Sequence, residues 1–315
     1  MRALTCFALV LSILAAAPSV GQDLPKVTVA MSGWTGFAPL SLAEKNGIFK
    51  KNGVDVTIKF IPQKDRHLAI ASGDVPCAAT TVETWIVWNA NGVATKQVVQ
   101  LDKSYGADGM VVRPAIARIA DLKGKTIAAS APGTAPYFTL AWFLKKNGLS
   151  VKDVKVVNLE PGPAAQAFLA GQNDAAMTYE PYLSSVREKP DAGRIIATTL
   201  DYPMIMDTFG CTPKFISEQP KLVQAMVNSY FEAIETIGKE PKKSFDTMGA
   251  VVKQAGEQFE KSQSYLRWQD RAANTKFFAG EIQSFSKEAA ELLLELGIIK
   301  TVPDINAIID TRFIK

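Results

Sequence analysis

The sequence predicts an α/β protein with two similar lobes, each built on a mostly parallel β-sheet flanked by helices. Two observations support this prediction. Segments with strand-like alternation and segments with helical periodicity follow one another along most of the chain, with short connections between them. Such alternation is typical of parallel sheets with helical crossovers. The same sequence pattern also occurs twice, about a hundred residues apart, which indicates two related lobes.

The repeated pattern has two parts. "FKKNGVDVTIKFIP" (49–62) resembles "FLKKNGLSVKDVKVVNLEP" (143–161), and "AIASGDVPCAATTVETW" (69–85) resembles "AFLAGQNDAAMTYEPYL" (167–183). A period of roughly 20 to 50 residues would indicate a solenoid. A longer unit that occurs only twice favours two lobes.

Local patterns place the elements of the first copy. Strands are expected at 26–32, 54–61, 75–81 and 96–102, where β-branched and apolar residues alternate or run together. Helices are expected at 38–53, 64–73 and 82–91, the first of them ending at the Asn-Gly pair 52–53.

The second copy follows the same plan and ends in a helical tail. Its strands are expected at 124–130, 154–160, 174–180 and 194–200, and its helices at 135–148 and 163–171. A return strand follows at 205–215, and then helices at 222–238, 244–256 and 286–297 with no further strand. We therefore expect lobe 1 to comprise residues 23–109 and 205–315, and lobe 2 residues 110–204.

Residues 1–22 have the pattern of a secretory signal peptide. Arg2 precedes the apolar run "ALTCFALVLSILAAA", and small residues follow in "PSVGQ". A membrane anchor is the alternative interpretation. We expect an exported, periplasmic protein that is a monomer. Its formal charge of +4 is scattered along the chain, without the basic stripe expected of a nucleic-acid-binding protein.

The cysteine and histidine content argues against a metal site. After the predicted signal peptide only Cys77, Cys211 and one histidine, His67, remain, and no cysteine pair has the spacing of zinc ligands. The return strand is expected beside the strand 75–81, which would bring the two cysteines together. A disulfide and two buried small apolar residues are both compatible with this placement, and we favour the second. No nucleophile elbow or phosphate loop occurs, so we expect no catalytic residues and no cofactor.

Candidate ligand-binding residues follow from the topology, because ligands of open α/β sheets bind beyond the carboxyl ends of the strands. They are Trp34, Thr81, Glu83, Asp102, Asp108, Ser130, Thr134, Tyr179, Glu180 and Asp207. Each has a structural alternative as a helix cap, a turn residue or a packing aromatic. The set is rich in carboxylates and poor in basic residues, which favours a ligand with a positive or neutral polar group that stacks on Trp34.

The chain resembles the periplasmic solute-binding proteins of ABC importers, in the nitrate, sulfonate and taurine group that also contains proteins for the thiamine pyrimidine precursor. The similar segments are "GWTGFAPLSLAEKNGIFKKNGVDV", "AIASGDV" before "AATT", "DLKGKTIAASAPGTAPYF" and "AFLAGQNDAAMTYEPYL". The resemblance covers residues 23–315. It implies the two-lobed periplasmic binding protein fold of type II, which closes on a small solute and delivers it to a membrane permease with its ATPase.

Several functions are compatible with this resemblance. It suggests taurine or another small sulfonate as the cargo, whereas the carboxylates and Trp34 suggest an amine-bearing or pyrimidine-like compound. A sensory solute-binding protein is an alternative to a transport component. An enzyme on the same fold, related to pyrimidine synthesis, would need a histidine in the cleft, and His67 lies among charged residues at the start of a predicted helix.

Overall fold

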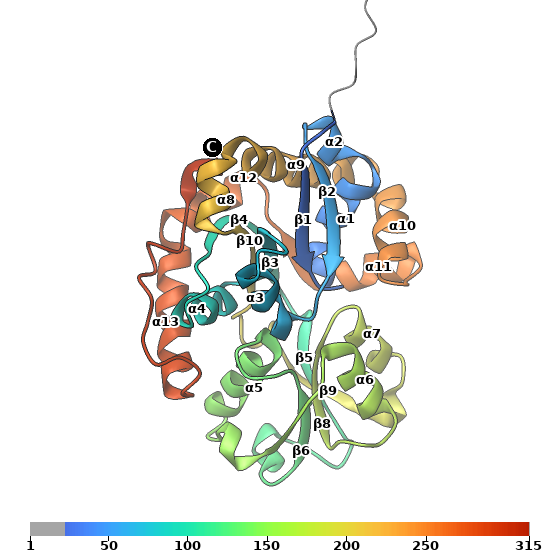
Figure 1. Ribbon diagram of the computed structural model, residues 1–315. Coiled ribbons are helices and arrows are strands. Elements are labelled where there is room, and N and C mark those ends of the chain that lie inside the picture. The colour runs from blue at the N-terminus through green and yellow to red at the C-terminus, as the bar shows by residue number, and fades with distance from the viewer. Residues whose placement is uncertain (1–22, 315) are drawn as a thin grey trace, which may run out of the picture.

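The computed structural model describes residues 23–314 as two β-sheets with helices on their faces, one sheet above the other (Figure 1). This confirms the predicted two-lobed α/β fold. We call the six-stranded sheet with its helices lobe 1 and the five-stranded sheet with its helices lobe 2. The predicted signal peptide, residues 1–22, lies outside the described residues. Within residues 23–314 no helix is long and apolar enough to cross a membrane.

The sheet of lobe 1 is mixed. Its spatial order is β11 (Leu266–Trp268), β4 (Lys96–Ser104), β10 (Met206–Cys211), β3 (Cys77–Thr81), β1 (Lys26–Met31) and β2 (Asp55–Phe60). Strand β1 pairs in parallel with β2 and β3, as predicted. Strand β10, which returns from lobe 2, runs antiparallel between β3 and β4. The inserted return strand is therefore what makes a mostly parallel sheet mixed.

The sheet of lobe 2 repeats this plan. Its order is β7 (Lys155–Asn158), β6 (Thr126–Ala129), β8 (Ala175–Tyr179), β5 (Asp108–Val112) and β9 (Arg194–Thr198). Strand β6 pairs in parallel with β7 and β8, as β1 does with β2 and β3. Gly73 and Gly171 follow equivalent helices with φ of 84° and 85°, a conformation that glycine adopts at little cost. These equivalences confirm the repeat.

Ten helices cover lobe 1 and three cover lobe 2 among the described residues. Those of lobe 1 are α1 (Ala38–Lys45), α2 (Ile48–Lys51), α3 (Gln63–Ala71), α4 (Val82–Ala90), α8 (Pro213–Glu218), α9 (Pro220–Lys239), α10 (Pro241–Val251), α11 (Gly256–Gln263), α12 (Arg271–Lys276) and α13 (Ile282–Glu295). Those of lobe 2 are α5 (Ala135–Lys146), α6 (Pro161–Leu169) and α7 (Tyr182–Arg187). The single helix expected at 38–53 is wrong, because Gly47 takes φ of 70° and separates α1 from α2.

Two short strands were missed. Strand β11 contradicts the expectation of a tail without strands; it has three residues, too few for a visible alternation, and forms by pairing with β4. Strand β5 begins with Asp108-Gly109, a dipeptide typical of turns. Its pairing with β8 and β9 overrides that local preference.

The two cysteines lie opposite each other on β3 and β10 and form a disulfide. Their proximity follows the prediction, but the favoured interpretation of two unbonded residues is wrong. The physical reason is the register: Cys77 and Cys211 are direct antiparallel partners with Cα atoms 4.0 Å apart. Sequence alone predicts that the strands are neighbours but does not fix this register.

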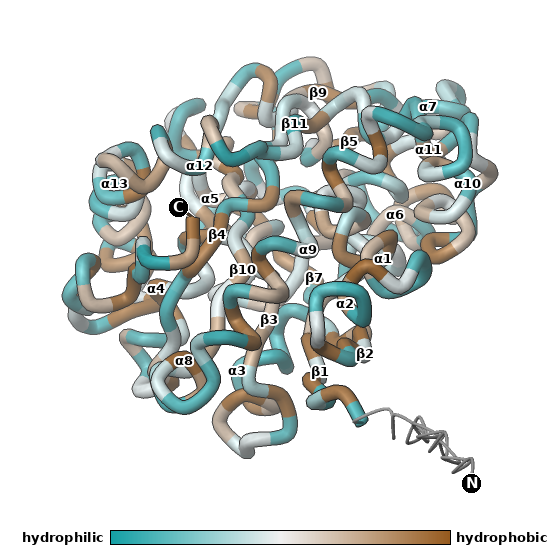
Figure 2. The backbone as a smooth tube through the Cα atoms, turned by 90° about the horizontal axis from the view of Figure 1, so that it is seen from above, coloured by the Kyte–Doolittle hydropathy of each residue, from teal (hydrophilic) through white to brown (hydrophobic). Residues whose placement is uncertain are grey.

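The connections between the lobes position the candidate site. We propose that the chain crosses at 105–107, between β4 and β5, and at 199–205, between β9 and β10. The expected boundary at residue 109 falls inside β5, whereas that at residue 205 falls just before β10. The carboxyl ends of β1 and β2 point toward lobe 2 in Figure 1, so the loops that follow the lobe 1 strands face the other lobe. Figure 2 shows the molecule from above, so that lobe 1 lies toward the reader and lobe 2 behind it.

Candidate ligand-binding site

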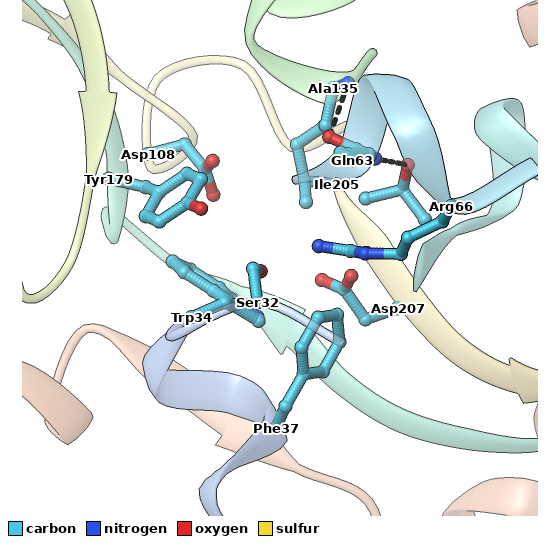
Figure 3. Close-up of a pocket in the computed structure, with 11 residues that line it drawn as sticks. Ser32, Trp34, Phe37, Gln63, Arg66, Asp108, Ala135, Tyr179, Ile205 and Asp207 are labelled. Atoms are coloured by element: carbon cyan, nitrogen blue, oxygen red, sulfur yellow. Dashed lines mark hydrogen bonds between the residues drawn. The ribbon is translucent and has the colours of Figure 1, made fainter. Parts of the chain in front are cut away.

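A cavity lies where the two lobes meet. The space within it measures about 270 Å³, a figure that includes room open to solvent. Its lining residues are Ser32, Trp34, Phe37, Gln63, Arg66, Thr81, Asp108, Ala135, Tyr179, Ile205 and Asp207 (Figure 3).

One buried arginine projects into this cavity. The side chain of Arg66 on α3 is 1% exposed. Its Nε donates to the carbonyl of Ile61 at 2.8 Å and its Nη1 to the carbonyl of Ala79 at 2.7 Å. The guanidinium points toward the centre of the cavity (Figure 3), and its Nη2 has no hydrogen-bond partner within residues 23–314. Burial lowers the pKa of Arg66 to about 10, so the group is a cation at neutral pH and can bind an anion.

The sequence pattern does not reveal Arg66, because it indicates a rim poor in basic residues. The segment "KDRHL" has four charged or polar side chains and is typical of a solvated helix start. Only Arg66 and Ile70 are buried on α3. They are four residues apart and share one helix face, and this spacing is the signal that could have placed Arg66 inward.

Two carboxylates line the same cavity. Asp108 begins β5 and Asp207 lies on β10, and each is at most 4% exposed. In the described part of the chain, Oδ2 of each has no hydrogen-bond partner. Burial raises the pKa of Asp108 to about 7. Burial, reinforced by repulsion from Asp102, raises the pKa of Asp207 well above its usual range.

Two further carboxyl groups lie behind this lining. Asp102 on β4 is the cross-strand partner of Asp207, and it accepts a hydrogen bond from the Trp34 indole at 3.2 Å. Glu83 is 1% exposed, and neither of its oxygens has a partner among the residues described. Burial raises the pKa of Glu83 to about 8 and that of Asp102 well above its usual range. The site thus combines one guanidinium with four desolvated carboxyl groups.

Aromatic rings form one wall of the cavity. Trp34 is 4% exposed and packs edge-on against Tyr179, with ring centroids 5.2 Å apart. Trp34 comes from the loop after β1 in lobe 1, whereas Tyr179 ends β8 in lobe 2. Figure 3 shows both rings on the opposite side of the cavity from Arg66. This wall therefore contains a contact between the two lobes.

The structure brings five of the predicted site residues to the cavity lining: Trp34, Thr81, Asp108, Tyr179 and Asp207. Asp102 and Glu83 are buried but do not line the cavity. The side chains of Ser130, Thr134 and Glu180 bond to other residues of the protein. Ser130 donates to the carbonyl of Leu159 and Thr134 to that of Ala131. Glu180 is fully buried in an ion pair with Arg187 and accepts from the Ser184 N–H. Contact of these ten residues with a ligand stays a prediction.

Gln63 is a second lining residue that sequence reasoning missed. Its Nε2 donates to the hydroxyls of Thr80 and Thr84 at 2.9 Å each. Its Oε1 accepts from the backbone N–H of Ala135, the first residue of α5 in lobe 2, at 3.2 Å. The N-terminus of α5, which follows the candidate residues Ser130 and Thr134, therefore has one of its N–H groups bonded to a side chain of lobe 1.

Comparison with known proteins places this geometry in a family. The family model described as NMT1/THI5 like matches residues 34–244. The chain belongs to the NMT1/THI5-like family. The matched region contains all the predicted site residues and both strands of the disulfide.

Relatives of this family member include the taurine-binding periplasmic protein of Escherichia coli (strain K12), which is 24% identical over 96% of this chain and 98% of its own length. Among solved structures, the alkanesulfonate-binding protein SsuA from Xanthomonas axonopodis pv. citri bound to MOPS covers 92% of this chain and 100% of its own, with a TM-score of 0.77 and 17% identity. The desulfurization enzyme DSZB covers 92% of this chain and 97% of its own, with a TM-score of 0.66 and 15% identity. The two structures share the fold with this chain.

Proposed function

We propose that this protein is a periplasmic solute-binding component of an ABC importer and that its cargo is a small zwitterionic aminosulfonate such as taurine. One observation carries the proposal. The unpaired Nη2 of Arg66 and the unpaired Oδ2 atoms of Asp108 and Asp207 face one cavity of about 270 Å³ within the described residues.

Charge balance favours a zwitterion over a simple anion or a simple cation. At pH 7 and above, a sulfonate without an amine would pair with Arg66 but leave ionised Asp108 desolvated and unpaired. An amine without an anionic group would leave the Arg66 guanidinium desolvated and unpaired. An unpaired buried charge costs several kcal/mol, so a ligand with both charges is favoured over either half. The taurine-binding relative supports the same choice.

The distribution of the lining supports a binding protein that closes on its solute. Arg66, Trp34 and Asp207 belong to lobe 1, whereas Tyr179 and Ala135 belong to lobe 2. A solute that contacts both lobes stabilises the closed arrangement over the open one. The relatives named as binding proteins, one of them periplasmic, support a non-catalytic role in the periplasm. We propose in addition that the protein is a monomer and delivers its solute to a membrane permease with its ATPase.

Isothermal titration calorimetry of the mature protein tests the proposal. Taurine would be compared with isethionate, in which a hydroxyl replaces the ammonium, and with ethanolamine, in which a hydroxyl replaces the sulfonate. We expect taurine to bind at least about 30-fold more tightly than either, since each analogue leaves one buried charge unpaired, at a cost of about 2 kcal/mol or more. Equal affinity for isethionate would refute the role of the carboxylates, and equal affinity for ethanolamine would refute that of Arg66.

A further inference from the structure

A second cavity adjoins the candidate site. It encloses about 630 Å³, also partly open to solvent, and lies between helices α3 and α4 of lobe 1 and the loop 131–134 of lobe 2. Its wall includes the rings of His67 and Trp88, whose centroids are 6.5 Å apart, together with Val87 and Pro132. We call this the outer chamber and the candidate site the inner chamber. The outer chamber is the larger of the two, and its lining combines these rings and aliphatic groups with the polar side chains of Lys64, Asn91 and Thr134.

Gln63 lines both chambers. Hydrogen bonds hold its amide on two sides: Nε2 donates to the hydroxyls of Thr80 and Thr84 in lobe 1, and Oε1 accepts from the Ala135 N–H in lobe 2. Figure 3 shows this side chain between Ala135 and Arg66 at the edge of the inner chamber. A side chain held in this way separates the two chambers. Its length limits how far a bound ligand can extend from one chamber into the other.

Gln63 also adjoins Arg66 and Asp207, two of the three charged groups that the proposed cargo would contact. It precedes Arg66 by three residues on α3, so the two side chains lie on one helix face. Its Nε2 is 3.4 Å from the hydroxyl of Thr81, whose cross-strand partner is Asp207. A substituent on an ammonium held at Asp207 would therefore meet Gln63 before it could reach the outer chamber.

We propose that Gln63 is a specificity-determining residue that restricts the cargo to small, unsubstituted aminosulfonates by separating the inner chamber from the outer one. The inference rests on the proposed function. Shortening Gln63 joins the chambers and admits an aminosulfonate with a hydrocarbon ring on its nitrogen, the ring lying against His67 and Trp88.

The test compares taurine with N-cyclohexyltaurine, whose secondary ammonium keeps its positive charge, by calorimetry on the mature protein. Wild type should prefer taurine. In Gln63→Ala the affinity for N-cyclohexyltaurine relative to taurine should rise at least about tenfold, which is the effect of burying roughly two methylene groups. Gln63→Ser provides a second shortened side chain, and thermal unfolding checks that each variant is folded.

Gln63→Leu is the matched control, because it keeps most of the side-chain volume and loses the hydrogen bonds to both lobes. It should retain the preference for taurine. A gain for the bulky ligand in both Gln63→Ala and Gln63→Leu would show that the hydrogen bonds matter, not the volume, and would overturn the inference. So would no gain in the shortened variants while wild type binds taurine. If wild type binds neither compound, the proposed function fails together with the inference.

Discussion

Asp108 offers the most direct test of the site, because a single substitution should change stability and binding in opposite directions. Its carboxyl is 4% exposed and Oδ2 has no partner in the described part of the chain. Burial raises the pKa of Asp108 from 3.8 to about 7. A tenfold change in the acid dissociation constant on folding corresponds to about 1.4 kcal/mol. In this buried arrangement, ionised Asp108 therefore costs up to about 4 kcal/mol of folding stability, an upper bound that opening of the lobes would lower.

The sign of the pH dependence follows from the raised pKa. Below pH 4 the carboxyl is protonated in both the folded and the unfolded protein, so its ionisation does not lower the folding stability. Between about pH 4 and pH 7 only the unfolded protein releases the proton, so this group's contribution to folding stability falls as pH rises; above pH 7 the loss is constant. Asp108→Asn should remove this dependence and be more stable than wild type at pH 8, with the difference vanishing near pH 4.

Binding should change the other way. The variant lacks the negative charge that pairs with an ammonium, so its affinity for taurine should fall at least about 30-fold. Denaturant unfolding at pH 8 and pH 4 and calorimetry with taurine measure the two effects. Asp191→Asn, which changes an exposed carboxylate of lobe 2, is the matched control and should change neither. An Asp108→Asn protein that is less stable than wild type at pH 8, or that binds taurine normally, would refute this account.

Three more predictions concern the site and its support. Taurine binding at pH 7 should release protons, because the ammonium lowers the raised pKa of Asp108, and affinity should rise from pH 6 to pH 8. Calorimetry in buffers of different ionisation enthalpy measures the release, and proton uptake would contradict it. Trp34→Ala should weaken binding at least about tenfold with the fold intact, and Trp34→Phe by less, since it keeps a ring but loses the N–H to Asp102; calorimetry with unchanged affinity for the alanine variant would remove Trp34 from the site. Replacing Cys77 and Cys211 together by alanine should lower the free energy of unfolding by about 4 to 5 kcal/mol, because the bond closes a long loop. Denaturant unfolding measures this loss, and taurine affinity should change less than about threefold because β10 keeps its backbone pairing.

Much of the fold could be predicted from the sequence because its strands alternate with helices and its pattern occurs twice. Segments whose structure is decided by long-range pairing could not. Strand β11 has three residues, and β5 begins with a turn dipeptide. Both become strands only because a partner strand with free hydrogen-bonding groups lies beside them.

The residues that line the cavity also divide into those that the sequence predicts and those that depend on tertiary packing. Residues at the ends of strands, such as Trp34, Thr81 and Asp207, were predictable because topology fixes where those ends lie. Gln63 and Arg66 stand at a helix start among polar neighbours, and the packing of α3 on β1 and β3 directs them inward. A long side chain can reach a cavity from a position whose sequence context is typical of the surface.

Under the proposed function, Arg66 accounts for both cargo classes. Carboxylates alone favour an amine, and the family resemblance alone favours a sulfonate. With Arg66 present, the two indications describe the two ends of one molecule. Closing the lobes without a ligand would desolvate charges of both signs that the open arrangement hydrates, so closure without a ligand is disfavoured. Asp108→Asn removes one of these charges, and small-angle X-ray scattering of the ligand-free variant should therefore give a smaller radius of gyration than wild type; an equal or larger radius would show that Asp108 does not oppose closure.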